Sequence, residues 1–228
     1  MDCSKMIVLI PAYEPNENMI ELLKELKKFD LNIVVVNDGS GSLYRDIFEE
    51  ACKYAKVLEH TVNKGKGRAL KTGLKYISGA FKGKYVVVTM DCDGQHKVRD
   101  AIKLYEYVIN NPKKLVLGKR LRSNKTPLRS RLGNSITRFV YRLATGLDVY
   151  DTQTGLRAFS NELIPFMLDV DGERFEYEMN VLLKCVVNKI EIKELEIETV
   201  YIDNNSHSHF KTIRDSILVY KQILKYKK

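Results

Sequence analysis

The stretch YVVVTMDCDGQH, residues 85–96, carries an apolar run into two aspartates that stand one residue apart. In an extended chain residues i and i+2 point the same way, so Asp91 and Asp93 share one face while Cys92 faces the other. Two carboxylates this close raise each other's pKa unless a cation lies between them. Their oxygens favour Mg²⁺ or Mn²⁺, ions that usually bridge to substrate phosphates. The stretch therefore predicts a metal site, with Gln95 as a neutral oxygen ligand, over a plain surface turn.

Two further polar segments carry weaker signals. Asp38, in VVVNDGSGS, ends an apolar run, where an acid can accept hydrogen bonds from a ribose hydroxyl or a base N–H. Gly65 and Gly67, in NKGKGRALKTG, precede a helical pattern and would let backbone amides approach an anion. A plain helix-opening turn explains these glycines equally well.

The positive charge of the chain is concentrated in two segments. The net charge is +9, residues 119–142 hold eight Lys/Arg and no acid, and residues 211–228 carry a net +5. The rest of the chain is therefore negative. This distribution favours local anionic partners over a surface that coats nucleic acid.

The first basic segment predicts an amphipathic helix after Pro127. One face would carry Arg131, Ser135, Arg138 and Arg142, and the opposite face the apolar stripe Leu128, Leu132, Ile136, Phe139 and Leu143. Arginine geometry suits phosphate oxygens, so the acid-free face favours a mono- or diphosphate partner over a merely solvated surface.

The second basic segment, residues 211–228, also predicts an amphipathic helix. Its apolar stripe would contain Ile213, Ile217, Tyr220 and Leu224, surrounded by Lys and Arg. This pattern suits a membrane surface that bears anionic lipid, and it suits docking onto the protein core equally well.

The elements that must position these residues alternate along the chain. Apolar runs predict strands, and segments with apolar residues at helical spacing predict helices between them. Such alternation indicates a mostly parallel sheet covered by helices on both faces, with ligands at the carboxyl ends of the strands. The predicted strands are 5–13, 31–37, 56–62, 84–93, 114–120, the later part of 151–160, and 190–202. The predicted helices are 17–29, 44–55, 65–77, 100–110, a long helix after Pro127, 177–187 and 211–228.

The composition fits one ordinary globular domain. Of 228 residues, 44% are hydrophobic and 29% charged, and no stretch approaches the roughly 20 apolar residues of a membrane-spanning helix. We expect no signal peptide. Cys3, Cys52, Cys92 and Cys185 lack metal-ligand spacing, which favours reduced thiols in the cytoplasm.

The motifs IPAY, VVNDGSG, NKGKGRALKTGL, DCDGQH, LGKR and DTQTGLRAFS occur in an order that resembles family 2 glycosyltransferases. The resemblance covers most of the chain and is strongest to the branch that makes polyprenyl-phosphate sugars. It implies an α/β GT-A fold, Rossmann-like, over residues 1–228. The implied parts are a nucleotide-sugar half, 1–118, an acceptor half, 119–210, and the basic helix, 211–228. RFEYEMNVLL resembles a bacterial subgroup that is often fused to a small multi-pass membrane protein, which implies such a partner or fused domain.

The resemblance also implies roles for individual residues. It implies a Mg²⁺ or Mn²⁺ ion held by Asp91, Asp93 and Gln95, and nucleotide-sugar binding by Pro11, Ala12, Tyr13, Glu14, Asp38, Lys66 and Asp91. It implies catalytic roles for Asp93, Arg120, Arg131 and Asp151. The chain departs from the family pattern at Pro15, where the family has Glu, with Glu14 and Glu17 nearby. It also lacks the arginine that some family members carry before a Ser-Lys pair near the end of the domain. His207 and His209 would take the place of that arginine.

The expected activity is an inverting, metal-dependent transfer of a hexose from a UDP- or GDP-sugar to polyprenyl phosphate. The enzyme would act peripherally, at the inner face of the cell membrane. A saccharide acceptor is the alternative, and it would need a base such as Asp151, Glu176 or Glu178. A nucleotidyltransferase, which releases pyrophosphate, is less favoured. The negative charge outside the basic segments argues against a nucleic-acid binder.

Overall fold

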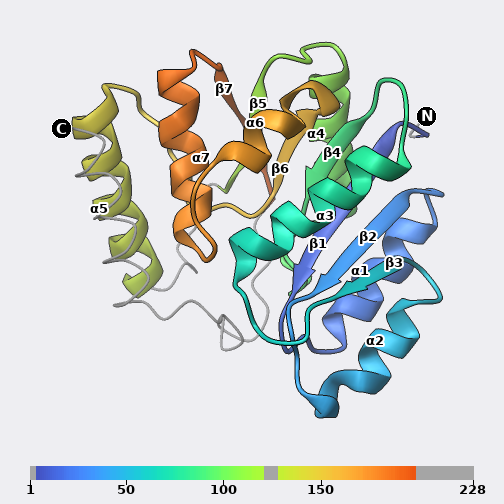
Figure 1. Cartoon of the computed structure of the whole chain (residues 1–228). Helices are drawn as coiled ribbons and strands as arrows, with labels where there is room; N and C mark the ends of the chain where they lie inside the picture. The colour runs from blue at the N-terminus through green and yellow to red at the C-terminus, as the bar shows by residue number, and fades with distance from the viewer. Residues whose placement is uncertain (1–3, 121–127, 199–228) are drawn as a thin grey trace.

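The apolar runs of the N-terminal half form one side of a seven-stranded sheet (Figure 1). The computed structural model describes residues 4–120 and 128–198, with the side chains of 128–136 left out of that description. The strand order is β3-β2-β1-β4-β6-β5-β7, and every strand except β6 runs parallel to the others. The predicted mostly parallel α/β sheet is therefore confirmed. The strands are β1 (Met6–Ala12), β2 (Asn32–Asn37), β3 (Lys56–Glu59), β4 (Val86–Thr89), β5 (Leu115–Arg120), β6 (Arg157–Ser160) and β7 (Ile192–Ile197).

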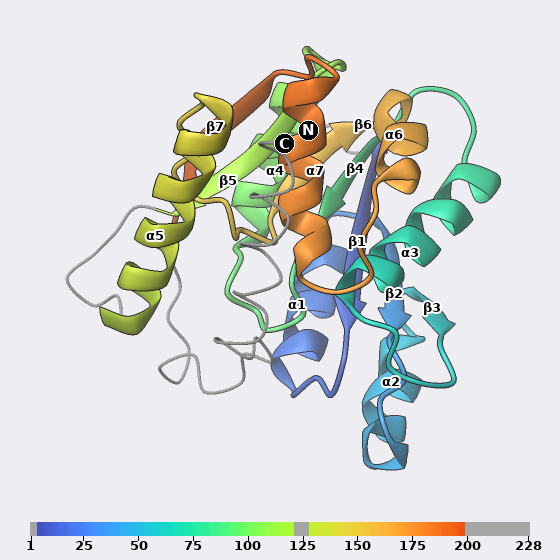
Figure 2. The same cartoon turned by 60° about the vertical axis from the view of Figure 1, so that its left-hand side comes forward.

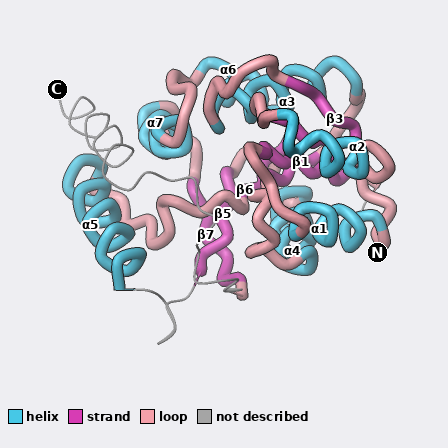
Figure 3. Tube along the Cα trace, turned by 90° about the horizontal axis from the view of Figure 1, so that it is seen from below, coloured by secondary structure: helices cyan, strands magenta, loops and turns pink. Residues whose placement is uncertain are grey.

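Helices cover both faces of the sheet, as Figures 2 and 3 show. All seven residues of β1 are buried, and because side chains alternate along a strand, Met6 and Val8 enter one core while Ile7 and Leu9 enter the other. Helices α1, α2 and α4 contribute to the first core, and α3, α6 and α7 to the second. The helices are α1 (Asn18–Lys27), α2 (Arg45–Ala51), α3 (Lys66–Ala80), α4 (Val98–Ile109), α5 (Leu128–Thr145), α6 (Ile164–Asp169) and α7 (Glu176–Val187).

The antiparallel strand β6 decides which loop reaches the carboxyl edge of the sheet. β6 pairs with both β4 and β5, and Arg157 at its start lies opposite Thr89 at the end of β4. Because β6 runs backwards, the loop that precedes it lies at the same edge as the loop that follows β4. The DTQTG motif is thereby brought beside the DCD motif. Strands β5 to β7 continue the same sheet as β1 to β4, so the two predicted halves of the chain share one sheet. The assignment of one half to donor binding and the other to acceptor binding stays a prediction.

Helix α5 stands beyond α7 at one side of the molecule, and the residue that anchors it belongs to neither of the two predicted faces (Figure 1). Tyr141 is fully buried, and its hydroxyl donates to the Leu182 carbonyl of α7. Phe139 and Leu143, which belong to the predicted apolar stripe, are 62% and 61% exposed. The helix therefore packs through Tyr141 and leaves part of its apolar stripe on the surface.

Candidate active site

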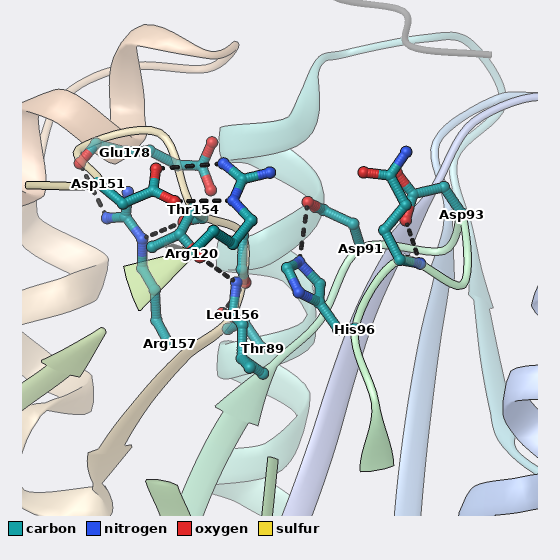
Figure 4. Close-up of polar contacts among 12 residues, drawn as sticks. Thr89, Asp91, Asp93, His96, Arg120, Asp151, Thr154, Leu156, Arg157 and Glu178 are labelled. Carbon is teal, nitrogen blue, oxygen red and sulfur yellow. Dashed lines mark hydrogen bonds and ion pairs between the residues drawn. The ribbon is translucent and has the colours of Figure 1, made fainter. Parts of the chain in front are cut away.

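Asp91 lies against the loop that precedes β6 (Figure 4). Thr89 Oγ1, at the end of β4, donates to the Gly155 carbonyl over 2.9 Å. A Cβ on Gly155 would lie 2.1 Å from Asp91 Oδ2, so the loop accommodates this carboxylate only with glycine at that position. The β4–β6 pairing thus creates the space that Asp91 occupies.

Lys66 lies between two carboxylates from distant parts of the chain. Its Nζ is 2.7 Å from Asp91 Oδ1 and 3.0 Å from Glu178 Oε1, and the Lys66 side chain is 15% exposed. Burial lowers the pKa of this ammonium, but Asp91 and Glu178 raise it by more, so the pKa lies above its ordinary value. Burial raises the pKa of Asp91, yet Lys66 and then His96 bring it well below its usual range. Lys66 is therefore charged and Asp91 ionised at neutral pH.

Asp93 has the opposite electrostatic environment. Burial, and next the Asp91 carboxylate, raise the pKa of Asp93. Its Oδ1 accepts from the backbone N–H of Gln95 over 3.0 Å. Among the residues that the structure describes, no lysine or arginine nitrogen forms an ion pair with Asp93. A buried acid whose ionised form lacks a positive partner is a suitable ligand for a cation.

The arrangement fits a divalent metal that is shared with a substrate. Asp91 and Asp93 supply carboxylate oxygens of the kind that Mg²⁺ and Mn²⁺ prefer. Within residues 4–120 and 128–198, no group of three or more His, Cys, Asp or Glu could hold a metal without further ligands. His96 is 3% exposed, with Nε2 3.6 Å from Asp91 Oδ2 and with a buried, unpartnered Nδ1. The ligand set of Asp91, Asp93 and Gln95 stays a prediction.

The Gly-rich turn before α3 packs closely against protein. A Cβ on Gly65 would lie 2.4 Å from the Glu173 carbonyl, and one on Gly67 would lie 2.6 Å from Tyr177 Cβ. The N–H of Arg68 donates to the Glu173 carbonyl over 2.9 Å. The glycines therefore let the α6–α7 loop, residues 170–175, cross the start of α3. The close packing explains why glycines stand here, and the approach of an anion to the amides of the turn stays a prediction.

The predicted nucleotide-binding residues at the end of β1 lie beside β2. Pro11 and Ala12 are the last residues of β1 and are buried. The Ala12 carbonyl accepts from the N–H of Asp38 over 2.8 Å. Glu14 has a φ of +48°, and its N–H donates to Ser40 Oγ over 2.9 Å. A hydrogen bond with Glu14 and then burial raise the pKa of the Tyr13 hydroxyl. The structure thus gathers these residues at the carboxyl edge, where their binding role stays a prediction.

Arg120 and Asp151 form one unit. Arg120 Nε is 2.7 Å from Asp151 Oδ2, and its Nη2 is 3.1 Å from Oδ1. The Asp151 side chain is 2% exposed and that of Arg120 28%. Burial lowers the pKa of the guanidinium, but Asp151, and more weakly Asp91 and Asp93, raise it above its ordinary value. Arg120 therefore lies within electrostatic reach of the acidic pair, as Figure 4 shows.

One residue of the site, Arg157, lacked a clear local signal. Arg157 is 5% exposed and donates to the carbonyls of Thr152, Thr154 and Glu178, so it ties the DTQTG loop to α7. The basic residue at the start of the apolar strand RAFS was the one signal for Arg157.

Glu176 and Glu178, in the stretch EYE, were both predicted as possible bases, and the structure gives them different partners. Glu178 reaches Lys66, whereas Glu176 accepts from the N–H groups of Glu173 and Arg174.

The predicted arginine face of α5 is only partly described. The side chain of Arg131 lies outside the described residues, as do the predicted helix 211–228 and the segment with His207 and His209. Arg138 donates to both oxygens of Asp148, over 2.7 and 2.5 Å, and its guanidinium lies 4.6 Å from the Tyr150 ring centre. Arg138 therefore has a carboxylate partner at the surface, and its role as a phosphate ligand stays a prediction.

The strand order and the acids at the carboxyl edge define an α/β protein with a candidate ligand site at that edge. The family model for glycosyl transferase family 2 matches residues 7–168. The chain therefore belongs to glycosyltransferase family 2.

Two archaeal relatives resemble the chain over most of their length. The UDP-N-acetylglucosamine–dolichyl-phosphate N-acetylglucosaminyltransferase of Methanococcus voltae is 32% identical over 219 residues, covering 86% of each chain. An uncharacterized protein of Methanocaldococcus jannaschii is 31% identical over 226 residues, covering 96% of this chain and 91% of that protein.

A solved structure shares the fold. Mycobacterium tuberculosis glucosyl-3-phosphoglycerate synthase, in complex with Mn²⁺, UDP-glucose and phosphoglyceric acid, has a TM-score of 0.74 at 18% identity. It covers 98% of this chain, which covers 80% of that structure. The chain thus has the GT-A fold that was predicted. Among the described helices, none has the length and apolar character needed to cross a membrane.

Proposed function

We propose that the protein transfers a hexose, with inversion, from a UDP- or GDP-sugar to polyprenyl phosphate. The observation that carries this proposal is that the three carboxylates predicted as possible bases already have partners. Asp151 pairs with Arg120, and Glu178 pairs with Lys66. Glu176 accepts from the α6–α7 loop through Oε1, and its Oε2 is buried without a hydrogen-bond partner among the described residues. A saccharide hydroxyl needs a base, whereas a phosphate is already an anion at neutral pH and mainly needs positioning. The arrangement supports a phosphate acceptor over a saccharide.

The similarity to the Methanococcus voltae enzyme, whose name specifies a dolichyl-phosphate acceptor, also supports this substrate class. In the proposed reaction a phosphate oxygen of the acceptor forms the bond to the sugar C1 as the bond from C1 to the donor diphosphate breaks. Asp91, Asp93 and Gln95 would hold Mg²⁺ or Mn²⁺, which supplies Lewis-acid stabilisation of the leaving diphosphate when bound.

The basic residues of the site would position the anions. Arg120 is held by Asp151, and Lys66 by Asp91 and Glu178, so both cations are preorganised and need little reorganisation during the reaction. Pro11, Ala12, Tyr13 and Glu14 would bind the nucleotide, and Arg131 would meet a phosphate.

We also infer that the protein acts at a membrane surface, on its cytoplasmic side. Phe139 and Leu143 of α5 and Leu147 just after it follow at intervals of four residues and are 62%, 61% and 45% exposed. The surrounding segment, 119–142, holds eight basic residues and no acid, which favours anionic lipid. The predicted helix 211–228 would add a second contact, and a multi-pass partner or fused domain stays a prediction.

The proposal is tested by incubating the protein with Mn²⁺ or Mg²⁺, undecaprenyl or dolichyl phosphate, and a panel of UDP- and GDP-sugars. We expect release of a nucleoside diphosphate and a glycolipid product with at least one donor, and only when the lipid phosphate is present. Lack of release with every donor would contradict the proposal. Transfer to saccharides but not to lipid phosphate would instead establish the alternative acceptor class.

A further inference from the structure

The guanidinium of Arg157, at the start of β6, is held by three backbone carbonyls. The residue is 5% exposed, and each of its three side-chain nitrogens donates to a carbonyl. Nε reaches the Thr154 carbonyl over 3.0 Å, Nη1 the Glu178 carbonyl over 2.9 Å, and Nη2 the Thr152 carbonyl over 3.3 Å. Among the residues that the structure describes, no carboxylate forms an ion pair with Arg157. Because a buried arginine is usually paired with an acid, what this cation contributes is the fixed geometry of its donors.

These three hydrogen bonds join the two segments that hold the cations of the site. Thr152 directly follows Asp151, whose carboxylate fixes Arg120. Glu178 lies in the first turn of α7, and its carboxylate binds Lys66. The backbone beside the first acid and the backbone of the second are therefore attached to the same guanidinium (Figure 4).

The loop between Asp151 and Gly155 is fixed at its other end as well. Thr89 Oγ1 donates to the Gly155 carbonyl over 2.9 Å, and a Cβ on Gly155 would lie 2.1 Å from Asp91 Oδ2. A guanidinium is planar and rigid, so its three hydrogen bonds leave the loop little freedom relative to α7. A movement of this loop would displace Asp151, and with it Arg120, and would also change the contact with Asp91. The position of the loop therefore affects both sides of the site.

We propose that Arg157 is a positioning residue that sets the separation between Arg120 and Lys66, the two cations that would meet the substrate phosphates. The inference rests on the proposed function for the nature of those phosphates. Arg157 acts through the loop and the helix, because it is 5% exposed and its own nitrogens already donate to carbonyls. The reaction depends on the relative position of the two substrates, and a misplacement of about 1 Å can lower a rate about a hundredfold. Loss of Arg157 should therefore affect both cations at once.

The test on the donor side measures equilibrium binding of UDP against UMP, and of GDP against GMP, in the presence of Mn²⁺ by calorimetry. Arg157→Gln removes the charge and Arg157→Lys retains it, and neither side chain can reach three carbonyls in the fixed geometry of a guanidinium. Both variants should weaken binding of the diphosphate roughly three- to tenfold, the range for loss of one hydrogen bond. Binding of the monophosphate should change less than about twofold, because it lacks the phosphate that Lys66 would meet.

Farnesyl phosphate, a soluble polyprenyl phosphate, serves as the probe on the acceptor side. Its binding should weaken in both Arg157 variants by a similar factor, because Arg120 loses its fixed position. Where the wild type binds both ligands, a loss on one side alone would overturn the link between the two cations. If the wild type does not bind farnesyl phosphate, the acceptor assignment and the Arg120 half of this inference both fail, and the nucleotide measurements still decide whether Arg157 positions Lys66.

Two controls separate this role from a general loss of stability. Ser160→Ala, at the opposite end of β6, removes another buried hydrogen bond, from Ser160 Oγ to the Pro112 carbonyl over 2.6 Å, and should leave all affinities unchanged. Arg157→Gln combined with Lys66→Met should bind the diphosphate no more weakly than Lys66→Met alone, since both act through the same ammonium. If the Arg157 variants do not fold, Thr89→Val, which releases the loop at its other end, takes their place.

Wild-type diphosphate binding in Arg157→Lys, with a loss only in Arg157→Gln, would overturn the proposal and show that Arg157 acts through its charge. Unchanged binding in both variants, or an equal loss of mono- and diphosphate binding, would overturn it as well. Additive losses in the double variant would show that Arg157 does not act through Lys66. These nucleotide measurements need no sugar transfer, so selective loss of diphosphate binding without lipid-dependent turnover would contradict the acceptor assignment alone.

Discussion

Asp151 fixes the guanidinium of Arg120 through two hydrogen bonds, of 2.7 and 3.1 Å, with the carboxylate itself 2% exposed. The backbone N–H groups of Tyr150 and Asp151 donate to the Glu194 carboxylate of β7 over 3.0 and 2.9 Å, which holds the loop in place. Arg120 thus faces the acidic pair with its orientation set by a neighbour that is almost inaccessible to solvent.

Loss of either partner of this pair should destabilise the fold. Arg120→Ala leaves the Asp151 carboxylate, which is 2% exposed, without its charged partner, and we expect a loss of about 3 kcal/mol in the free energy of unfolding, measured by urea denaturation. The matched control is Arg138→Ala, which breaks the other bidentate pair. It leaves the Asp148 carboxylate, which is 40% exposed, so the loss of this pair should cost less than about 1 kcal/mol. Equal losses at both positions would contradict the importance of burial.

Asp93→Asn should separate stability from activity. The pKa of Asp93 is raised, so its ionised form is disfavoured in the metal-free fold, and a neutral amide should raise the Tm at pH 7. Metal-dependent nucleoside diphosphate release should fall at least about a hundredfold, because a Lewis-acid metal contributes several kcal/mol. We expect Mn²⁺ to raise the Tm of the wild type and to leave the Tm of Asp93→Asn unchanged. Retained metal-dependent turnover would show that Asp93 is not a ligand.

The two acids at the start of α7 should differ in their effect. Glu178→Gln removes one of the two charges that hold Lys66, and we expect kcat to fall about tenfold or more with little change in far-UV circular dichroism. Glu176→Gln retains an oxygen that can accept from the α6–α7 loop, and kcat should stay within about threefold of the wild type. The reverse order of effects would show that Glu176 is the functional acid.

The exposed apolar residues around the end of α5 should govern binding to vesicles. Phe139→Ser with Leu143→Ser should weaken sedimentation with vesicles of anionic phospholipid at least tenfold, since burial of each side chain in lipid is worth about 1.5–3 kcal/mol. Leu43→Ser is the control, because Leu43 is 92% exposed on the short helical turn Ser42–Tyr44, far along the sheet from α5. An unchanged affinity of the double variant would exclude this stripe as the membrane contact.

Cys92, between the two aspartates, should resist alkylation. Burial, and next Asp93 and Asp91, raise the pKa of its thiol to about 12. At pH 8 only about one molecule in ten thousand would carry the reactive thiolate. Cys52 is exposed and should react first, as peptide mapping after iodoacetamide treatment would show. Asp93→Asn removes one nearby charge and should speed the reaction at Cys92. Equal labelling of Cys52 and Cys92 in the wild type would contradict this electrostatic environment.

Much of the fold follows from local patterns. Runs such as IVLI and YVVV are apolar at every position, which is possible only for strands buried on both faces, and the structure confirms them as β1 and β4. The spacing of Asp91 and Asp93 at the end of β4 already predicted acids at the ligand-binding edge. The short helix α6 was not predicted, because its six residues are too few to show a helical period.

The sequence by itself determined the strands, the helices that cover them, and the edge at which the acids gather, because each depends on hydrophobic periodicity within a few residues. Only the tertiary structure decided which polar groups become partners. Arg120 and Asp151 are 31 residues apart, and Lys66 and Glu178 are 112 apart. These pairs form because β6 enters the sheet antiparallel between β4 and β5, which brings the loop after Tyr150 and the start of α7 to the carboxyl edge. No local pattern encodes that direction, since an apolar strand of four residues fits the sheet either way.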